Sequence, residues 1–240
     1  MASNHDSLLF VENGTLLMLN TDLMTVDSTP WSLGEICDLA WSEKLNQYLI
    51  VNSWGSIYTV NPDDLNSTEA IDQIPEEQWR SITTSDRSLF LATYNEDPTI
   101  GQFDLFSAFQ SKKQIKSPYI CEQNDEIHQI RATDDRMLVL VGSPSKRTAR
   151  LDVRSIQNFQ LIWSRPLEIL ARSSIPMMRF CLLPANEILV TCEGQSRVFY
   201  FDRNRAMETV DHKKPVWSAE FFLPRRLVIR TDRFMIVYPM

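Results

Sequence analysis

The sequence contains few of the residues that catalytic and cofactor-binding motifs require. Its 240 residues include 6 glycines and 3 histidines. Scarce glycine disfavours a loop that cradles phosphates, and scarce histidine leaves little for catalysis or metal binding. No Gly-x-Ser-x-Gly motif is present to provide an exposed nucleophilic serine. The composition therefore predicts a protein that is not an enzyme and uses neither a metal nor another cofactor.

Paired cysteines and long apolar runs are also absent. Cys37, Cys121, Cys181 and Cys192 have neither C-x-x-C nor zinc-site spacing. The longest apolar stretches, such as Met137–Val141, are far too short to cross a bilayer, and the first residues lack the basic and apolar regions of a signal peptide. We therefore expect reduced cysteines, no membrane segment and a cytoplasmic location.

The charge balance bears on the class of partner. The chain has 24 Lys and Arg against 31 Asp and Glu, a net charge of −7. Proteins that bind nucleic acids gain affinity from a basic surface, so this balance disfavours nucleic acid as the partner. The chain is 43% hydrophobic and 23% charged, which is typical of globular proteins, and no linker or low-complexity tract interrupts it. The sequence predicts a single domain over residues 1–240.

Pairs of short apolar runs recur along the chain. In five of the six pairs the second run stops at an Asn or Asp, the residues that start turns by bonding their own backbone, whereas the sixth ends at Pro239. These residues are Asn20, Asn61, Asp104, Asp152 and Asp202, so the spacings between them are 41, 43, 48 and 50 residues. The first runs are Leu8–Val11, Tyr48–Val51, Leu89–Ala92, Met137–Val141, Ile188–Val190 and Leu227–Ile229.

Two further segments complete the repeat. In all units but the first, an apolar run precedes the pair: Ile36–Trp41, Trp79–Thr83, Ile127–Ala132, Met177–Leu182 and Val216–Phe221. A weaker fourth segment follows the turn, as in Leu23–Val26 and Phe159–Trp163. Four short strands per 40 to 50 residues are typical of propeller blades. The sequence thus predicts an all-β propeller of about six four-stranded blades, whose terminal blades are incomplete or belong to a larger ring. An irregular β-sandwich is the alternative.

Two local predictions follow from this organisation. If the ring is closed, Leu8–Leu19 lies against Leu227–Tyr238, because open ends would expose apolar blade faces. The segment Arg165–Ser173 is compatible with one short helix, since Pro166 suits a first helical turn.

The ends of the second runs carry a family resemblance. Leu17-Met-Leu-Asn20 and Phe199-Tyr-Phe-Asp202 resemble the strand ends of WD40-type repeats. The Gly-His and Trp-Asp dipeptides of that family and the glycine-rich turns of NHL repeats are absent. The chain is therefore similar to a divergent WD40-like (WD40/NHL-type) propeller. This resemblance implies a ring with one face that docks a protein or peptide, without catalysis.

Candidate binding residues lie in the segments that commonly share one face of a propeller, namely the starts of the innermost strands and the loops that join the middle strands. They are Trp54, Trp79, Arg80, Tyr94, His128, Arg179 and Trp217. Their aromatic and cationic groups would suit a peptide with acidic or aromatic side chains. The competing interpretation is that Trp79 and Trp217 pack between blades and that His128 is a hydrogen-bonded core residue.

Two other functions remain open on the sequence. Glu35, Glu77 and Glu126 each precede an innermost strand, as in calcium-dependent propeller hydrolases of the lactonase type. Basic residues in Arg225–Arg233, beside Trp217, could instead contact RNA. Solvated loops are the simpler interpretation of acidic pairs such as Glu76-Glu77.

Overall fold

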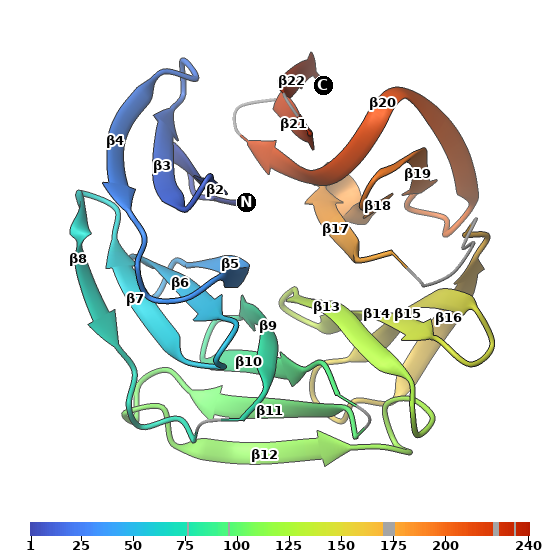
Figure 1. Ribbon diagram of the computed structural model, residues 1–240. Helices are drawn as coiled ribbons and strands as arrows, with labels where there is room; N and C mark the ends of the chain where they lie inside the picture. The colour runs from blue at the N-terminus through green and yellow to red at the C-terminus, as the bar shows by residue number, and fades with distance from the viewer. Residues whose placement is uncertain (76, 96, 170–175, 223–225, 233) are drawn as a thin grey trace.

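The chain folds into small antiparallel sheets that are arranged around a common axis (Figure 1). The described residues form five sheets, four with four strands and one with six. The all-β propeller arrangement is thus confirmed. The computed structural model describes residues 1–75, 77–95, 97–169, 176–222, 226–232 and 234–240.

Each sheet is a meander in which consecutive strands pair. The first sheet comprises β1 (Ala2–Ser3), β2 (Ser7–Glu12), β3 (Thr15–Asn20) and β4 (Thr25–Pro30). The second comprises β5 (Ile36–Ser42), β6 (Gln47–Asn52), β7 (Ile57–Asn61) and β8 (Asp64–Ala70). The third comprises β9 (Trp79–Thr84), β10 (Ser88–Thr93), β11 (Thr99–Asp104) and β12 (Ser111–Lys116). The fourth comprises β13 (Glu126–Ala132), β14 (Arg136–Ser143), β15 (Thr148–Ser155) and β16 (Leu161–Leu167). The fifth comprises β17 (Met178–Leu183), β18 (Glu187–Cys192), β19 (Gln195–Phe201), β20 (Met207–Phe222), β21 (Arg226–Thr231) and β22 (Met235–Pro239).

Burial is greatest in the second strand of a sheet and lowest in the outer strand, which explains the strength of each sequence signal. All six apolar first runs lie in strands, as predicted: β2, β6, β10, β14, β18 and β21. Strand β10 is buried at every residue because neighbouring sheets cover both of its faces. The outer strand β12, with sequence SKKQIK, is exposed at all but one residue. The fourth segments are weak in the sequence because their outer faces need no apolar residues.

The prediction of about six separate blades is wrong, since the last unit shares a sheet with the fifth. Residues 207–211 and Val216 of β20 pair with β19, and pairing with β21 begins at Val216 and extends to Phe222. The intervening His212–Pro215 stays extended instead of forming a turn, so one long strand joins both units (Figure 1). Strands β21 and β22 therefore extend the fifth sheet.

Two local predictions also need correction. The expected helix is wrong over Arg165–Leu167, which belongs to β16, and residues 170–175 lie outside the described part of the chain. Asp152 does not end β15, which pairs with its neighbours beyond this residue and runs to Ser155; the Asp152 carboxylate accepts the Ser164 hydroxyl of β16 at 2.6 Å. In the described ranges the only helix is the 3₁₀ turn Pro184–Asn186. None of the described helical structure is long and apolar enough to cross a membrane.

Side chains join the innermost strands of successive blades. These strands are sheet edges, whose free N–H groups need acceptors. A carboxylate oxygen of Asp38 on β5 accepts the Ile82 N–H of β9 at 3.1 Å. The Ser81 hydroxyl of β9 in turn accepts the Ile130 N–H of β13 at 3.0 Å. The polar residues in these apolar runs thus fix one blade against the next around the axis.

The first and last strands also pack together. Leu8 and Phe10 of β2 share a buried cluster with Val228 of β21, and Met235 packs against it. The Ser3 hydroxyl donates to the carbonyl of Phe221 at 2.9 Å. The predicted contact between 8–19 and 227–238 is therefore confirmed, and the apolar faces of the two segments cover each other.

Candidate functional site

A cavity of about 540 Å³ opens at the axis on one face of the ring. Its volume is within the range of ligand pockets in proteins. The loops that precede innermost strands and those that join second and third strands surround it. Five of the seven predicted binding residues line it: Arg80, Tyr94, His128, Arg179 and Trp217. Trp31, Glu35, Cys37, Glu193 and Arg230 contribute further functional groups to the lining.

A bulge at the same place in four inner strands directs side chains into this cavity. The strand register shifts at Cys37 in β5, Arg80 in β9, His128 in β13 and Trp217 in β20. A bulge leaves one residue without an opposite partner and turns its side chain away from the regular alternation. All four bulge residues line the cavity, so the repeat itself builds the site.

Trp79 is not part of the binding surface, and its prediction as a binding residue is wrong. Its side chain is 0% exposed and lies in the core cluster between the second and third sheets. The indole packs edge-on against Phe103, with ring centroids 6.0 Å apart. Its Nε1–H donates to the carbonyl of Pro75 at 3.0 Å. The alternative interpretation, an indole packed between blades, is confirmed for Trp79 but not for Trp217, which is 40% exposed.

Trp54 lies on the same side of the ring but outside the cavity lining. It is 64% exposed in the loop between β6 and β7. The indole lies against Gly34 of the cavity wall, where an added Cβ would come within 3.2 Å of Trp54 Cδ2. Trp54 therefore extends the rim and does not contribute to the floor.

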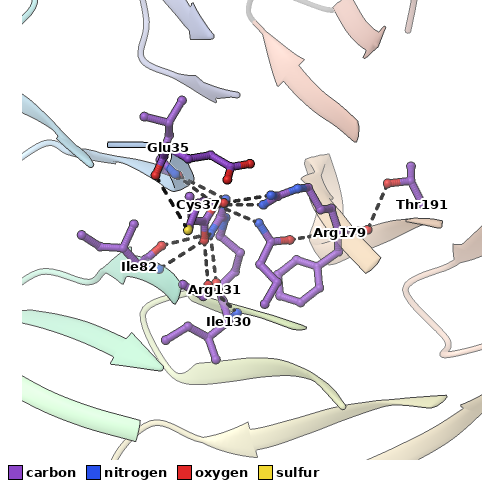
Figure 2. Close-up of polar contacts among 12 residues, drawn as sticks. Glu35, Cys37, Ile82, Ile130, Arg131, Arg179 and Thr191 are labelled. Carbon is purple, nitrogen blue, oxygen red and sulfur yellow. Dashed lines mark hydrogen bonds and ion pairs between the residues drawn. The ribbon is translucent and has the colours of Figure 1, made fainter. Parts of the chain in front are cut away.

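The floor of the cavity is a buried charge network around Asp38, a residue that sequence reasoning missed. The carboxylate is 2% exposed and lies 3.0 Å from Arg131 Nη1 and 3.4 Å from Arg179 Nη1. Gln129 Nε2 donates to it at 3.2 Å. Figure 2 shows Arg131 and Arg179 reaching from β13 and β17 toward the strand that carries Cys37. The network closes the axis below the cavity.

Charge pairing outweighs burial at Asp38. Burial by itself would raise the pKa of the carboxyl group, but the guanidinium groups of Arg131 and Arg179 and the hydrogen bond from Ser81 hold the pKa well below its usual range. A smaller hollow of about 210 Å³, lined by Arg131 and Glu220, lies at the opposite side of the network. The sequence did contain a signal for this network, namely a charged residue within each of two apolar strands, Asp38 in β5 and Arg131 in β13.

His128 is a buried residue in which one ring nitrogen has no hydrogen-bond partner. The residue is 3% exposed, and its Nδ1 accepts the Met178 N–H at 3.4 Å. The neutral ring therefore carries its hydrogen on Nε2, which has no hydrogen-bond partner. Glu126 is 4.0 Å from Nε2 and already accepts the Tyr94 hydroxyl at 2.7 Å. Burial and the charge of Arg179 lower the pKa of His128 to about 4.

The low pKa of His128 predicts a pH dependence of stability. The unfolded histidine, with a pKa near 6.5, takes up a proton that the folded protein excludes between about pH 6.5 and 4. The free energy of unfolding should therefore decrease as the pH is lowered through this window, by up to about 1.4 kcal/mol per pH unit from this residue. Urea denaturation at several pH values measures the slope. His128→Gln should flatten it, and equal slopes for both proteins would contradict the assignment.

The arginines of the cavity differ in their partners. Arg80 Nη1 donates to the Cys37 sulfur at 3.0 Å, and Arg179 Nη2 donates to the Cys37 carbonyl at 2.8 Å. Arg230 makes no side-chain hydrogen bond or ion pair with any residue in the described ranges. Burial raises the pKa of the Cys37 thiol despite its hydrogen bond from Arg80. The site therefore offers strong donors and a thiol that remains protonated.

The residues proposed for a calcium site do not form a cluster. Glu126 is hydrogen-bonded to Tyr94, while Glu77 accepts from Gln114 at 3.4 Å and Glu35 lines the axial cavity. Among the residues that the structure describes, no three His, Cys, Asp or Glu side chains are grouped to hold a metal. Glu76 lies outside the described residues.

The basic segment proposed to contact RNA is only partly described. Arg225 and Arg233 lie outside the described residues. Arg226 donates to the carbonyl of Thr21, and the Lys214 ammonium lies 3.9 Å from the centre of the Phe234 ring. These two contacts tie basic groups to neighbouring strands.

Comparisons with known proteins support the architecture alone. No protein-family model matches the chain, and no curated protein matches it. The structure is similar to hydrazine synthase of Kuenenia stuttgartiensis, with a TM-score of 0.68 and 10% identity over 100% of this chain and 75% of that one. It is also similar to a protein of unknown function from Bacteroides caccae, with a TM-score of 0.66 and 16% identity over 98% of this chain and 90% of that one. At these identities the likeness indicates a shared fold.

Proposed function

We propose that this propeller is a non-enzymatic binding module whose axial cavity receives a segment of a partner protein. The observation that carries this proposal is convergence at the axis. Arg80, Tyr94, His128, Arg179 and Trp217 come from three different sheets and line one cavity. The WD40-like character of the repeats and a cytoplasmic location belong to the same proposal.

The mixture of groups in the cavity supports protein recognition. Trp31 and Trp217 line it together with three arginines. Tryptophan and arginine are enriched among residues that dominate binding energy at protein interfaces. An indole contributes a large apolar surface with few rotatable bonds, and a guanidinium offers several directed donors. Trp54 on the rim would extend such a contact beyond the cavity.

The electrostatics of the site favour binding over catalysis. A catalytic cysteine needs a thiolate, but burial raises the pKa of the Cys37 thiol. A general base works best with a pKa near the working pH, whereas that of His128 is about 4. The neighbouring carboxylates are already engaged, since Asp38 is ion-paired with Arg131 and Glu126 accepts the Tyr94 hydroxyl. These groups can hold a ligand but are poorly suited to move protons.

Selection from a displayed library of random peptides tests the proposal. The purified protein should select peptides that bind reversibly at this face. Trp217→Ala should weaken their binding by at least about 2 kcal/mol, or roughly thirtyfold, if the indole is a main anchor.

Phe106→Ala is the matched control for this substitution. Phe106 is also an exposed aromatic residue, 58% accessible, but it lies between β11 and β12, on the opposite side of the ring from the cavity loops. Its removal should leave the affinity unchanged. If no peptide is selected, or both variants bind like wild type, the proposed function is wrong.

A further inference from the structure

Hydrogen-bond donors that line the axial cavity lack protein acceptors. The Nε2–H of His128 is buried and unpartnered. Arg230 makes no side-chain hydrogen bond or ion pair with the described residues, and the Arg80 guanidinium donates only to the Cys37 sulfur. Buried donors without acceptors are costly, so such a site is completed by a group that accepts several hydrogen bonds at once.

The neighbouring guanidinium groups of the cavity also favour a ligand group that accepts hydrogen bonds. Arg179 and Arg80 both contact Cys37, one through its carbonyl and the other through its sulfur. Burial lowers the pKa of Arg230, and the charge of Arg179 lowers it further, although Glu12 and Glu193 partly oppose this. Like charges held together at a half-buried surface are stabilised by an anion between them.

The acidic residues limit how much negative charge the site can accept. The lining includes Arg80, Arg179 and Arg230 against Glu35 and Glu193, a surplus of one positive charge. The charges of the Asp38–Arg131 pair in the floor cancel. Glu126, next to His128, adds another carboxylate nearby. With Glu126 counted, the positive and negative charges around the cavity are equal, so a singly charged group would be held by directed hydrogen bonds and the dianionic form of a phosphate is disfavoured.

We propose that the axial cavity binds the side-chain carboxylate of an acidic residue in a partner peptide, between Arg80, Arg230 and the Nε2–H of His128. The guanidinium groups donate to the carboxylate oxygens, and His128 donates as a neutral ring. Trp31 and Trp217 pack against the residues on either side of the acidic one. The inference depends on the proposed function, because it names the partner group recognised at the same site.

Three blocked peptides that differ at one residue test this inference. Acetyl-Ala-Glu-Ala-amide, its Gln analogue and its phosphoserine analogue are titrated into ¹⁵N-labelled protein and followed by NMR. The Glu peptide should shift amide resonances of residues around the cavity, such as Cys37 and Met178. It should bind at least about tenfold more tightly than the Gln peptide, since charge-assisted hydrogen bonds are lost in the analogue.

Substitutions within one strand provide the matched comparison. Arg230→Gln should weaken the Glu peptide about tenfold and leave the Gln peptide unaffected. Arg226→Gln, in the same strand but outside the cavity lining, should bind the Glu peptide like wild type. Arg80→Gln is a second test if Arg230→Gln does not fold.

Each other outcome overturns the inference. Equal affinity for the Glu and Gln peptides, or no binding of either, would mean that a carboxylate is not recognised. Tighter binding of the phosphoserine peptide would assign the cavity to phosphate. Peptides selected by display that contain no acidic residue and bind Arg230→Gln normally would remove the carboxylate inference while leaving the proposed function intact.

Discussion

Asp38→Ala is expected to lower the free energy of unfolding by about 3–5 kcal/mol. The substitution leaves the guanidinium groups of Arg131 and Arg179, now 3.0 and 3.4 Å from the Asp38 carboxylate, without their counter-charge. It also removes the acceptor for the Ile82 N–H that joins β9 to β5. Breaking a buried ion pair by deleting one partner is costly because the other charge remains buried.

Urea denaturation of Asp38→Ala beside Asp86→Ala measures this effect. Asp86 also forms an ion pair, with Lys44 at 3.7 Å, but its side chain is 76% exposed. Surface pairs contribute little, so Asp86→Ala should change stability by less than about 1 kcal/mol. Asp38→Asn keeps most hydrogen bonds and loses the charge, so it should be intermediate. A loss below about 1 kcal/mol for Asp38→Ala would show that the network is not a main link between blades.

Trp79→Ala should destabilise the protein by about 3–5 kcal/mol, through loss of buried apolar surface and a residual cavity. The indole is fully buried between two sheets, and its Nε1–H bond to Pro75 would also be lost. Gly101 lies so close that a Cβ there would be 2.9 Å from Trp79 Cη2, which indicates tight packing. Thermal and urea unfolding report the change.

Trp54→Ala is the control of the same chemistry. Trp54 is largely exposed, so its removal should change stability by no more than about 0.5 kcal/mol. The difference between the two variants separates a core tryptophan from a surface one. If both variants unfold like wild type, Trp79 is not the wedge between the second and third sheets.

The inner part of each blade could be predicted because its residues are apolar and because Asn or Asp residues occur at its turns. Strand β10 is buried throughout, and Asn20 and Asp202 bond the backbone of the turns that follow them. The two-residue strand β1 carries no periodic signal and was missed. The continuity of β20 could not be foreseen, because a His-Lys-Lys-Pro segment is typical of a loop. In β20 this segment has no strand partner itself, and the residues on either side of it, Asp211 and Val216, are the ones paired with neighbouring strands.

The binding residues were predicted from the segments that commonly share one face of a propeller. The wrong prediction, Trp79, arises from the register of its strand. When Ser81 of β9 is aligned with Ser218 of β20, Trp217 occupies the position equivalent to Arg80, and Trp79 the position equivalent to Val216. Adjacent residues of a strand point to opposite sides, so this offset of one residue buries Trp79 and exposes Trp217. The Asp38 network was missed because its partners come from three blades, and the sequence does not show which side chains meet at the axis.

A crystal structure of the protein with the strongest display-selected peptide tests the central claim most directly. Our account predicts a peptide that enters the axial cavity, with an acidic side chain between Arg80 and Arg230 and a neighbouring residue on Trp217. A peptide bound along an outer strand or on the opposite face, with the axial cavity unchanged, would contradict it.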